Sequence, residues 1–184
     1  QVLTPSPDRR LVDCPCYRQC GGCAFRHIRY QAELRLKEAA VRDAFQRVGG
    51  FPLAPLPIVG ALEDSRCRNK AQYPLGVGKD GKIIAGFYAR NSHRIIPAGD
   101  CLLHPVAFGE ILCCIVDFLN QNLASVYNEG TGKGLFRHVY LRQASSTGEI
   151  LVCLVTTKAR PPKIGELAEL LREKFPQIVG VCVN

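Results

Sequence analysis

The chain has 184 residues, of which 47% are hydrophobic, and its 24 lysines and arginines against 16 acidic residues give a formal net charge of +8. This length suits one domain, and this apolar content can form a core without crosslinks. The longest apolar run, at 111–116, is far shorter than the ~20 residues of a membrane-spanning helix, so we expect no membrane contact. The basic excess indicates a polyanionic partner.

Residues 1–13 are polar and contain prolines, which predicts a linker from an upstream domain. The chain has no methionine and stops within an apolar run, so we expect both ends to have been cut from a longer protein. Four cysteines then follow in CPCYRQCGGC at 14–23. Three of them are spaced C-x5-C-x2-C, and the glycine pair between the last two would let the backbone fold tightly around a bulky inorganic centre.

The three cysteines at this spacing, Cys14, Cys20 and Cys23, need a fourth thiolate to complete a cubane or tetrahedral site. Cys101 is the best candidate because it follows a Gly-Asp turn in a polar loop, and Cys67 is second. Three interpretations remain open: an iron–sulfur cluster, which the spacing favours, a structural zinc site, and a thioredoxin-like redox pair of the last two cysteines.

The remaining cysteines favour a reducing environment. Cys16 is an alternative ligand, although its C-x-C spacing makes it the odd member of the cluster. Cys113, Cys114, Cys153 and Cys182 lie in apolar stretches, where we expect buried free thiols. A secreted disulfide scaffold is therefore disfavoured, and we expect a cytoplasmic protein.

The first half of the chain predicts one helix and three strands. Apolar residues at helical spacing predict the helix, which a glycine pair at 49–50 ends. A turn at 79–81 joins two of the strands into a hairpin. In chain order we expect a helix at 28–48, an extended connector at 51–57, strands at 66–76 and 82–90, and a short strand at 92–98.

The second half predicts a long amphipathic helix that begins at Pro105. Its apolar stripe consists of Phe108, Ile111, Leu112, Ile115, Val116, Leu119 and Leu123. A glycine-rich loop, a hairpin, a helix and a strand follow at 128–134, 137–144 with 149–157, 163–174 and 177–183. This order predicts an α+β domain, an antiparallel sheet with packed helices, rather than a doubly wound parallel sheet.

A basic segment, RCRNKAQYP, begins at Arg66. If the segment is a strand, alternation places Arg66, Arg68, Lys70 and Gln72 on one face. With the nearby Arg90, His93 and Arg94, these residues are candidates to bind phosphates or base edges of a nucleic acid. An ordinary solvated sheet face is the alternative. Tyr73, Phe87 and Tyr88 could stack on bases, although we expect at least two of them in the core.

The stretch GTGKG at 130–134 lacks the spacing of a phosphate-binding loop, so we expect an ordinary flexible loop there. The four histidines, His27, His93, His104 and His138, have no Ser or Cys partner at a recognisable spacing. We therefore expect structural histidines rather than catalytic ones.

The stretch at 14–50, CPCYRQCGGCAFRHIRYQAELRLKEAAVRDAFQRVGG, resembles the cluster motif and following helix of the TrmA/RumA-type RNA (uracil-5-)-methyltransferases. Three further stretches of this chain resemble later blocks of that family, in the same order: RCRNKAQYPLG, GFYARNSHRIIPAGDC and GLFRHVYLRQASSTGEILVCLVT. The resemblance covers nearly the whole chain. It implies the central iron–sulfur part of an enzyme that methylates C5 of a uridine in tRNA or rRNA with S-adenosylmethionine.

The resemblance also implies a [4Fe-4S] cluster on Cys14, Cys20, Cys23 and Cys101, in agreement with the spacing. It implies a fragment without the Rossmann-like methyltransferase domain, so no catalytic residue and no S-adenosylmethionine site is expected in this chain. We expect an iron–sulfur loop at 14–27, a helix and connector at 28–62, and a central α+β RNA-contacting domain at 63–184. The 28–48 helix would expose apolar surface and pack on the missing domain or on a second copy.

Two alternatives of other classes remain. One is a small iron–sulfur electron-transfer protein, and the other is a zinc-bound nucleic-acid-binding module. Metal analysis would separate zinc from iron, and the salt dependence of RNA binding would identify a phosphate-binding protein.

Overall fold

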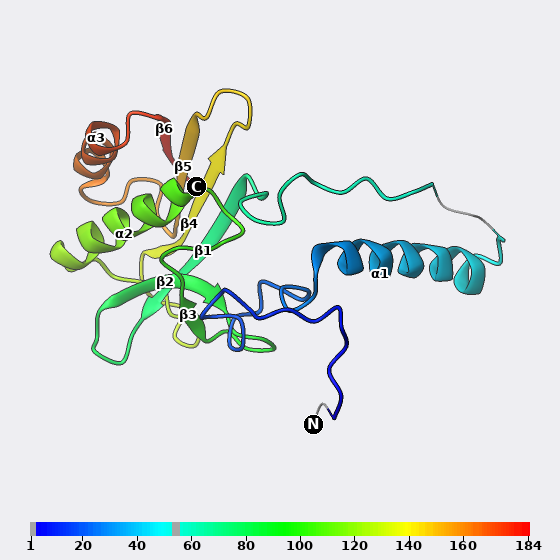
Figure 1. Ribbon diagram of the computed structural model, residues 1–184. Coiled ribbons are helices and arrows are strands. Elements are labelled where there is room, and N and C mark those ends of the chain that lie inside the picture. Colours follow the sequence, from blue (N-terminus) through cyan, green and yellow to red (C-terminus); the bar gives the residue numbers. More distant parts are fainter. Residues whose placement is uncertain (1–2, 53–55) are drawn as a thin grey trace.

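The structure, a computed structural model, describes residues 3–52 and 56–184; the predicted linker at 1–13 and connector at 51–57 therefore lie partly outside the described residues. Six strands form one sheet in the spatial order β3-β2-β1-β4-β5-β6. Helices α2 and α3 pack on one face of this sheet (Figure 1). In chain order the elements are α1 (Tyr30–Asp43), the π-helical η1 (Ala44–Val48), β1 (Lys70–Val77), β2 (Ile83–Tyr88), β3 (Ile95–Pro97), α2 (Val106–Gln121), β4 (Phe136–Gln143), β5 (Ile150–Thr156), α3 (Ile164–Lys174) and β6 (Ile178–Val183).

The core forms between α2, α3 and the inward side chains of the strands. The predicted stripe of α2 supplies its largest part, with Phe108, Ile111 and Ile115 fully buried against residues such as Val139 of β4. Burial of each large apolar side chain contributes about 1.5–3 kcal/mol. The prediction for Leu123 is wrong: the helix ends at Gln121, the backbone of Leu123 turns to a φ of +50°, and its side chain is 92% exposed.

The first strand starts later than predicted. Residue 66 has a φ of +54°, so the alternation expected from Arg66 onwards begins only at Lys70. The preceding residues pair elsewhere, because the backbone N–H groups of Arg66 and Arg68 donate to the carbonyls of Leu102 and Leu103 at 2.8 and 2.9 Å. This pairing ties the segment before β1 to the loop that carries residue 101.

The last strand also corrects a prediction. The pairs β1–β2, β2–β3, β1–β4 and β4–β5 are antiparallel, as expected. The β5–β6 pair is parallel. The intervening helix α3 carries the chain back along the sheet, so β6 runs in the same direction as β5.

One face of β1 and β4 points away from the core helices. Along β1, Lys70 and Gln72 are exposed whereas Ala71 and Tyr73 are buried, which is the alternation expected for a half-buried sheet. The paired residues of the two strands are Lys70 with Arg142, Gln72 with Tyr140 and Pro74 with His138, and we call these six the outer face. None of the six strands in the described chain contains an acidic residue.

Helix α1 extends away from the sheet, as Figure 1 shows. Its side chains and those of η1 and the residues after it are largely exposed, including Leu36, Val41, Phe45, Val48 and Phe51. The predicted exposure of apolar surface at 28–48 is therefore confirmed. In the part of the chain that the structure describes, every helix is too short or too polar to cross a membrane.

Candidate metal centre and nucleic-acid interface

The cysteine-rich loop lies against the end of β2. Cys20 forms an isolated bridge with Ala89, and the N–H of Gly21 donates to the carbonyl of Tyr88 at 2.9 Å. A Cβ at Gly21 would lie 3.1 Å from that carbonyl oxygen, so a side chain there would push the loop away from the strand. The glycine that the motif provides thus permits a close backbone approach.

Four of the ten thiols influence one another although one of them is distant in sequence. Burial raises the pKa of the Cys23 thiol, and negative charge on three neighbours raises it further, namely Cys101, Cys20 and Cys14. Burial likewise raises the pKa of Cys101, with added contributions from Cys14 and Cys20. The fold therefore brings Cys101 into the electrostatic range of the cysteine loop.

Hydrogen-bond donors and one positive charge near these sulfurs favour the deprotonated, thiolate form. The positive charge of Arg68 lowers the pKa of both Cys23 and Cys101, opposing the effect of burial. The N–H of Gly22 donates to the Cys20 sulfur at 3.3 Å, and the backbone of Leu103 forms a hydrogen bond that lowers the pKa of Cys101. Among residues 3–52 and 56–184, no three His, Cys, Asp or Glu side chains are grouped as ligands of a single metal ion.

Cys16 also lies near the loop thiols: burial raises its pKa, and the negative charges of Cys14 and Cys20 raise it further. Cys16 donates its thiol to the carbonyl of Pro97 at 3.6 Å, and Cys67 is exposed. All ten cysteines are free thiols. The prediction of burial is wrong for Cys113 and Cys182, which are exposed because each points outward from its helix or strand.

Arg26 joins the start of the loop to the segment before β1. This guanidinium is only 6% exposed, and it donates to both carboxylate oxygens of Asp13, at 2.8 and 2.7 Å. It also donates to the Asp64 carbonyl and the Ser65 hydroxyl. The hydrogen bonds with Arg26 lower the pKa of Asp13, so the pair is ionised at neutral pH. Sequence reasoning missed this role because the partners are brought together only by the fold.

Arg66 fixes the loop that carries Cys101. Its guanidinium donates to both oxygens of Asp100, one at 2.7 Å, and to the carbonyls of Cys101 and His104 at 3.0 and 2.8 Å. Hydrogen bonding with Arg66 lowers the pKa of Asp100. A planar fork with several donors suits this set of acceptors, which a lysine could not satisfy.

The structure does not bring the seven predicted RNA-binding residues into one row. Arg90 donates to the carbonyl of Cys23 at 3.0 Å, and His93 pairs with Glu129 at 2.6 Å. Arg66 and Arg68 lie beside the thiols as described, Arg94 is exposed after β2, and Lys70 and Gln72 lie on the outer face. Of the three aromatic residues, Tyr73 and Phe87 pack in or against the core, as expected for at least two of them.

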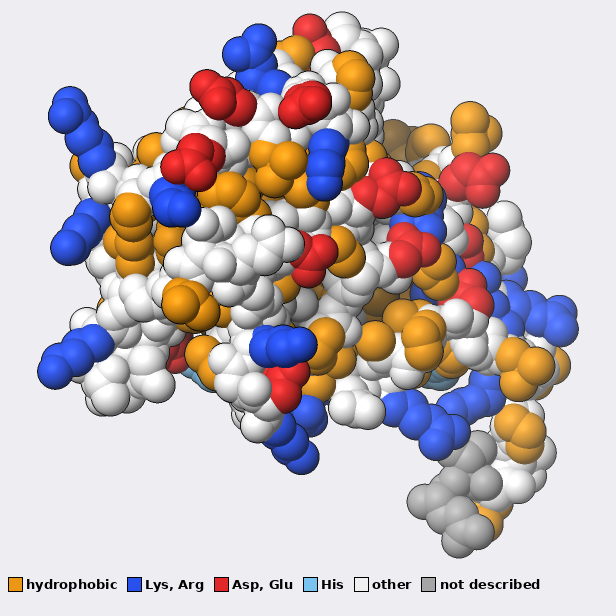
Figure 2. Space-filling model, turned by 90° about the vertical axis from the view of Figure 1, so that its left-hand side faces the viewer, with side chains coloured by type: hydrophobic (Ala, Val, Ile, Leu, Met, Phe, Trp, Pro, Cys, Tyr) orange, Lys and Arg blue, Asp and Glu red, His pale blue; other side chains and the backbone are white. Residues whose placement is uncertain are grey.

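Charge differs between the two sides of the sheet. On the side of α2 and α3, acidic and basic side chains are interspersed (Figure 2). The exposed acids of these helices are Glu110, Asp117, Glu166, Glu169 and Glu173. The outer face instead presents the paired Lys70 and Arg142 beside Tyr140, without an acid on either strand. Cations and an aromatic ring on an exposed sheet can contact both the phosphates and the bases of a nucleic acid.

Searches against known sequences identify relatives along the whole chain. No family model matches it. A protein from Bacillus cereus named "uncharacterized RNA methyltransferase" is 36% identical over 185 aligned residues, covering 100% of this chain and 40% of that protein. A Nostoc protein of the same description is 35% identical with the same coverage. The resemblance to RNA methyltransferases is therefore confirmed, and the chain spans 40% of the length of these curated relatives.

A solved structure supports the fold. The crystal structure of Pyrococcus abyssi tRNA (uracil-54, C5)-methyltransferase in complex with S-adenosyl-L-homocysteine matches with a TM-score of 0.65 at 23% identity. The match covers 91% of this chain and 37% of that one. At this identity the likeness establishes a shared fold.

Proposed function

We propose that this chain, which is similar over its whole length to proteins named RNA methyltransferases, is the iron–sulfur and RNA-contacting part of an enzyme that methylates C5 of a uridine in tRNA or rRNA. The observation that carries the proposal is the similarity of the whole chain to proteins named RNA methyltransferases, and the mutual electrostatic influence of Cys14, Cys20, Cys23 and Cys101 supports the iron–sulfur part of it. The chain spans 40% of its relatives, so the S-adenosylmethionine site and the catalytic residues would belong to the remainder of the protein. The chain alone would be catalytically inactive and, as a thiol-rich protein, cytoplasmic.

The proposed ligands of a [4Fe-4S] cluster are Cys14, Cys20, Cys23 and Cys101. The chemistry of these residues suits such a group, because four thiols are available as ligands. Backbone groups of Gly22 and Leu103 form hydrogen bonds to the sulfurs of Cys20 and Cys101, and the positive charge of Arg68 favours the thiolate form of Cys23 and Cys101. When bound, the cluster would crosslink the loop to the segment before α2. Arg26 and Arg66 hold these two segments from either side.

The proposed RNA surface comprises the outer face and the basic residues around the cysteine loop. Lys70 and Arg142, which are cross-strand partners, would pair with phosphates, and Tyr140, two residues before Arg142 on the same face of β4, would stack on a base. Arg68, Arg90 and Arg94 would extend this surface towards the thiols. These residues would hold the substrate strand while the remainder of the protein carries out methyl transfer.

The part of the full-length protein that lies outside this chain would pack on helix α1 and η1. Their exposed apolar side chains need a partner, and relatives more than twice as long supply additional chain to cover them. A lone copy of this chain would bury the same surface by pairing with itself. Sedimentation of the 184-residue chain compared with the full-length protein tests this, because covering by the remainder predicts a monomer only for the full-length protein.

The cluster is tested by anaerobic reconstitution with iron and sulfide, followed by metal analysis and visible absorption. Cys101→Ser should lose most of the bound iron and the visible band, whereas the matched control Cys67→Ser should retain both. Zinc without a visible band would indicate the zinc module instead. Equal iron in the two variants would remove Cys101 from the ligand set.

The enzymatic proposal is tested with the full-length protein. Incubation with tritiated S-adenosylmethionine and total tRNA or rRNA should label 5-methyluridine, which digestion and chromatography identify. A reversible redox couple without RNA affinity or methylation would instead indicate an electron-transfer protein.

A further inference from the structure

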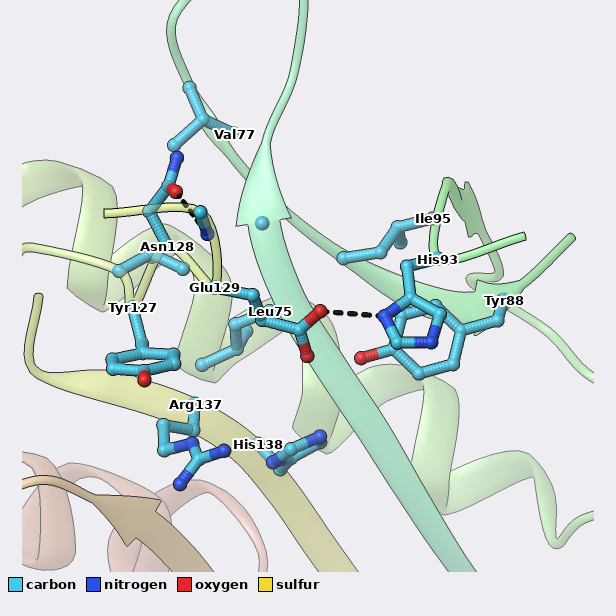
Figure 3. Close-up of a pocket in the computed structure, with 13 residues that line it drawn as sticks. Leu75, Val77, Tyr88, His93, Ile95, Tyr127, Asn128, Glu129, Arg137 and His138 are labelled. Atoms are coloured by element: carbon cyan, nitrogen blue, oxygen red, sulfur yellow. Dashed lines mark hydrogen bonds and ion pairs between the residues drawn. The ribbon is translucent and has the colours of Figure 1, made fainter. Parts of the chain in front are cut away.

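A hollow of about 360 Å³ lies beside the end of β1, outside the cysteine site, and of the residues predicted to bind RNA it includes His93. Its walls come from four segments: the end of β1, the stretch from the end of β2 to the start of β3, the loop at 126–130, and the start of β4 (Figure 3). Leu75 and Ile95 supply apolar lining. This volume falls in the range of pockets that hold one small ligand.

Flat groups form two sides of the hollow. The ring of His93 stacks on that of Tyr88 with 5.0 Å between centroids and 23° between planes. Across the hollow, the guanidinium of Arg137 lies 4.5 Å from the centre of the Tyr127 ring. Nucleobases stack on aromatic rings and on arginine planes alike. The pocket is thus lined by surfaces suited to a planar ring.

An irregularity in β4 directs two consecutive side chains into the hollow. The register between β4 and β5 shifts between Phe136 and His138, so Arg137 is the additional residue of a bulge. In a regular strand Arg137 and His138 would point to opposite faces, yet both line this pocket, as Figure 3 shows.

One polar group in the pocket lacks a partner. The Nδ1 atom of His138 is buried and makes no hydrogen bond within the described chain. Burial, with a further effect of Arg137, lowers the pKa of His138, so its ring is neutral at physiological pH and offers one donor and one acceptor nitrogen. A base edge, which also mixes donors and acceptors, would meet the His138 ring where it lines the hollow, whereas Nδ1 itself is closed to the surface.

We infer that this hollow binds a single unpaired nucleotide of the RNA, with its base between the Tyr88–His93 stack and the Arg137–Tyr127 stack and its edge on His138. The site deepens the proposed RNA-binding role and rests on it. Because Pro74 and His138 belong to the outer face, a strand lying on that face could continue into the hollow.

The charges of the pocket favour a nucleotide over a free phosphate. Glu129 lies at its edge and pairs with His93, which leaves Arg137 as the cation without a salt bridge among the described pocket residues. A bare anion would meet the negative charge of Glu129 nearby. A base presents no net charge, and its own phosphate can lie outside, towards Arg137.

The test compares two fluorescently labelled probes, a short single-stranded oligouridylate and an abasic ribose-phosphate oligomer of the same length, by anisotropy at fixed salt. The wild-type chain should prefer the base-bearing probe by about tenfold, the scale of one stacked base. R137Q and H138L should lose most of this preference. The control R142Q should bind both probes more weakly and keep the preference.

A second measurement uses only the wild-type chain, so it does not depend on whether the variants fold. Photo-crosslinking of a 4-thiouridine oligomer to the wild-type chain should label Tyr88 or Tyr127 in peptide mass spectra. If the chain binds RNA but shows neither this crosslink nor a loss of preference in R137Q and H138L, the pocket proposal is overturned and the RNA-binding role stands. If neither probe nor intact tRNA or rRNA binds, the RNA-binding role itself fails.

Discussion

At the residue scale, two arginines of this basic chain stabilise the cysteine region rather than face a partner. Arg26 satisfies acceptors on both sides of the loop, and Arg66 does the same around Cys101. Composition predicts only that cations are abundant. It cannot say which of them the fold pairs with Asp13 or Asp100, because these partners lie far away in sequence.

Replacement of Arg66 by lysine should weaken the loop that presents Cys101. The lysine keeps the charge but cannot form the paired hydrogen bonds to Asp100 together with those to two carbonyls. Because the Arg66 side chain is 31% exposed, solvent screening limits the expected loss to about 1–2 kcal/mol in the free energy of unfolding. Urea denaturation measures it, with Arg172→Lys on exposed α3 as the matched control. Equal midpoints for both variants would contradict the structural role.

His138 should make stability depend on pH. Burial lowers its pKa in the folded state, so below the ordinary value of about 6.5 the unfolded chain takes up the proton more readily. Stability therefore falls as pH decreases from that value towards the folded-state pKa. His138→Leu removes this contribution, and its loss of stability between pH 7.5 and pH 5 in urea titrations should be smaller than that of the wild type.

At the scale of elements, most of the architecture follows from periodicity. The stripe from Phe108 to Leu119 predicts α2, and alternation predicts the hairpins, because these patterns reflect burial on one side of a regular element. The errors arise where long-range pairing overrides local pattern. Arg66 and Arg68 pair with the loop after residue 101, and α3 returns the chain so that β6 is parallel.

The predicted apolar stripe of α2 gives a matched pair of substitutions, one inside the helix and one beyond its end. Ile111→Ala should cost about 2–5 kcal/mol, because it removes a fully buried side chain and leaves a cavity between helix and sheet. Leu123→Ala should change the free energy of unfolding by less than about 0.5 kcal/mol, since that side chain is already in solvent. Similar losses in denaturant unfolding would mean that the stripe extends to Leu123 as its spacing predicts.

At the scale of the molecule, the sequence predicts a four-cysteine cluster site but does not predict the hollow beside β1. The ligand set of Cys14, Cys20, Cys23 and Cys101 stays a prediction, although the structure gives these thiols a mutual electrostatic influence. The hollow beside β1 combines residues from β2, the loop at 126–130 and a bulge in β4. No local spacing connects these segments, and a bulge reverses the direction that alternation predicts for Arg137. Only Tyr88, as a candidate for stacking, and His93, as an RNA contact, were indicated by sequence.

The distribution of charge predicts which side of the sheet meets RNA. Lys70→Gln with Arg142→Gln removes two charges from the outer face, and Arg172→Gln with Lys174→Gln removes two from α3, so both double variants have the same net charge. If phosphates contact the outer face, only the first pair should reduce the slope of log K against log salt for single-stranded RNA, by about 1.4 for two contacts. An equal reduction in both would mean that net charge alone attracts the RNA. An unchanged slope in the first would mean that the outer face is merely solvated, because phosphates neutralised by those two residues must release their counterions on binding.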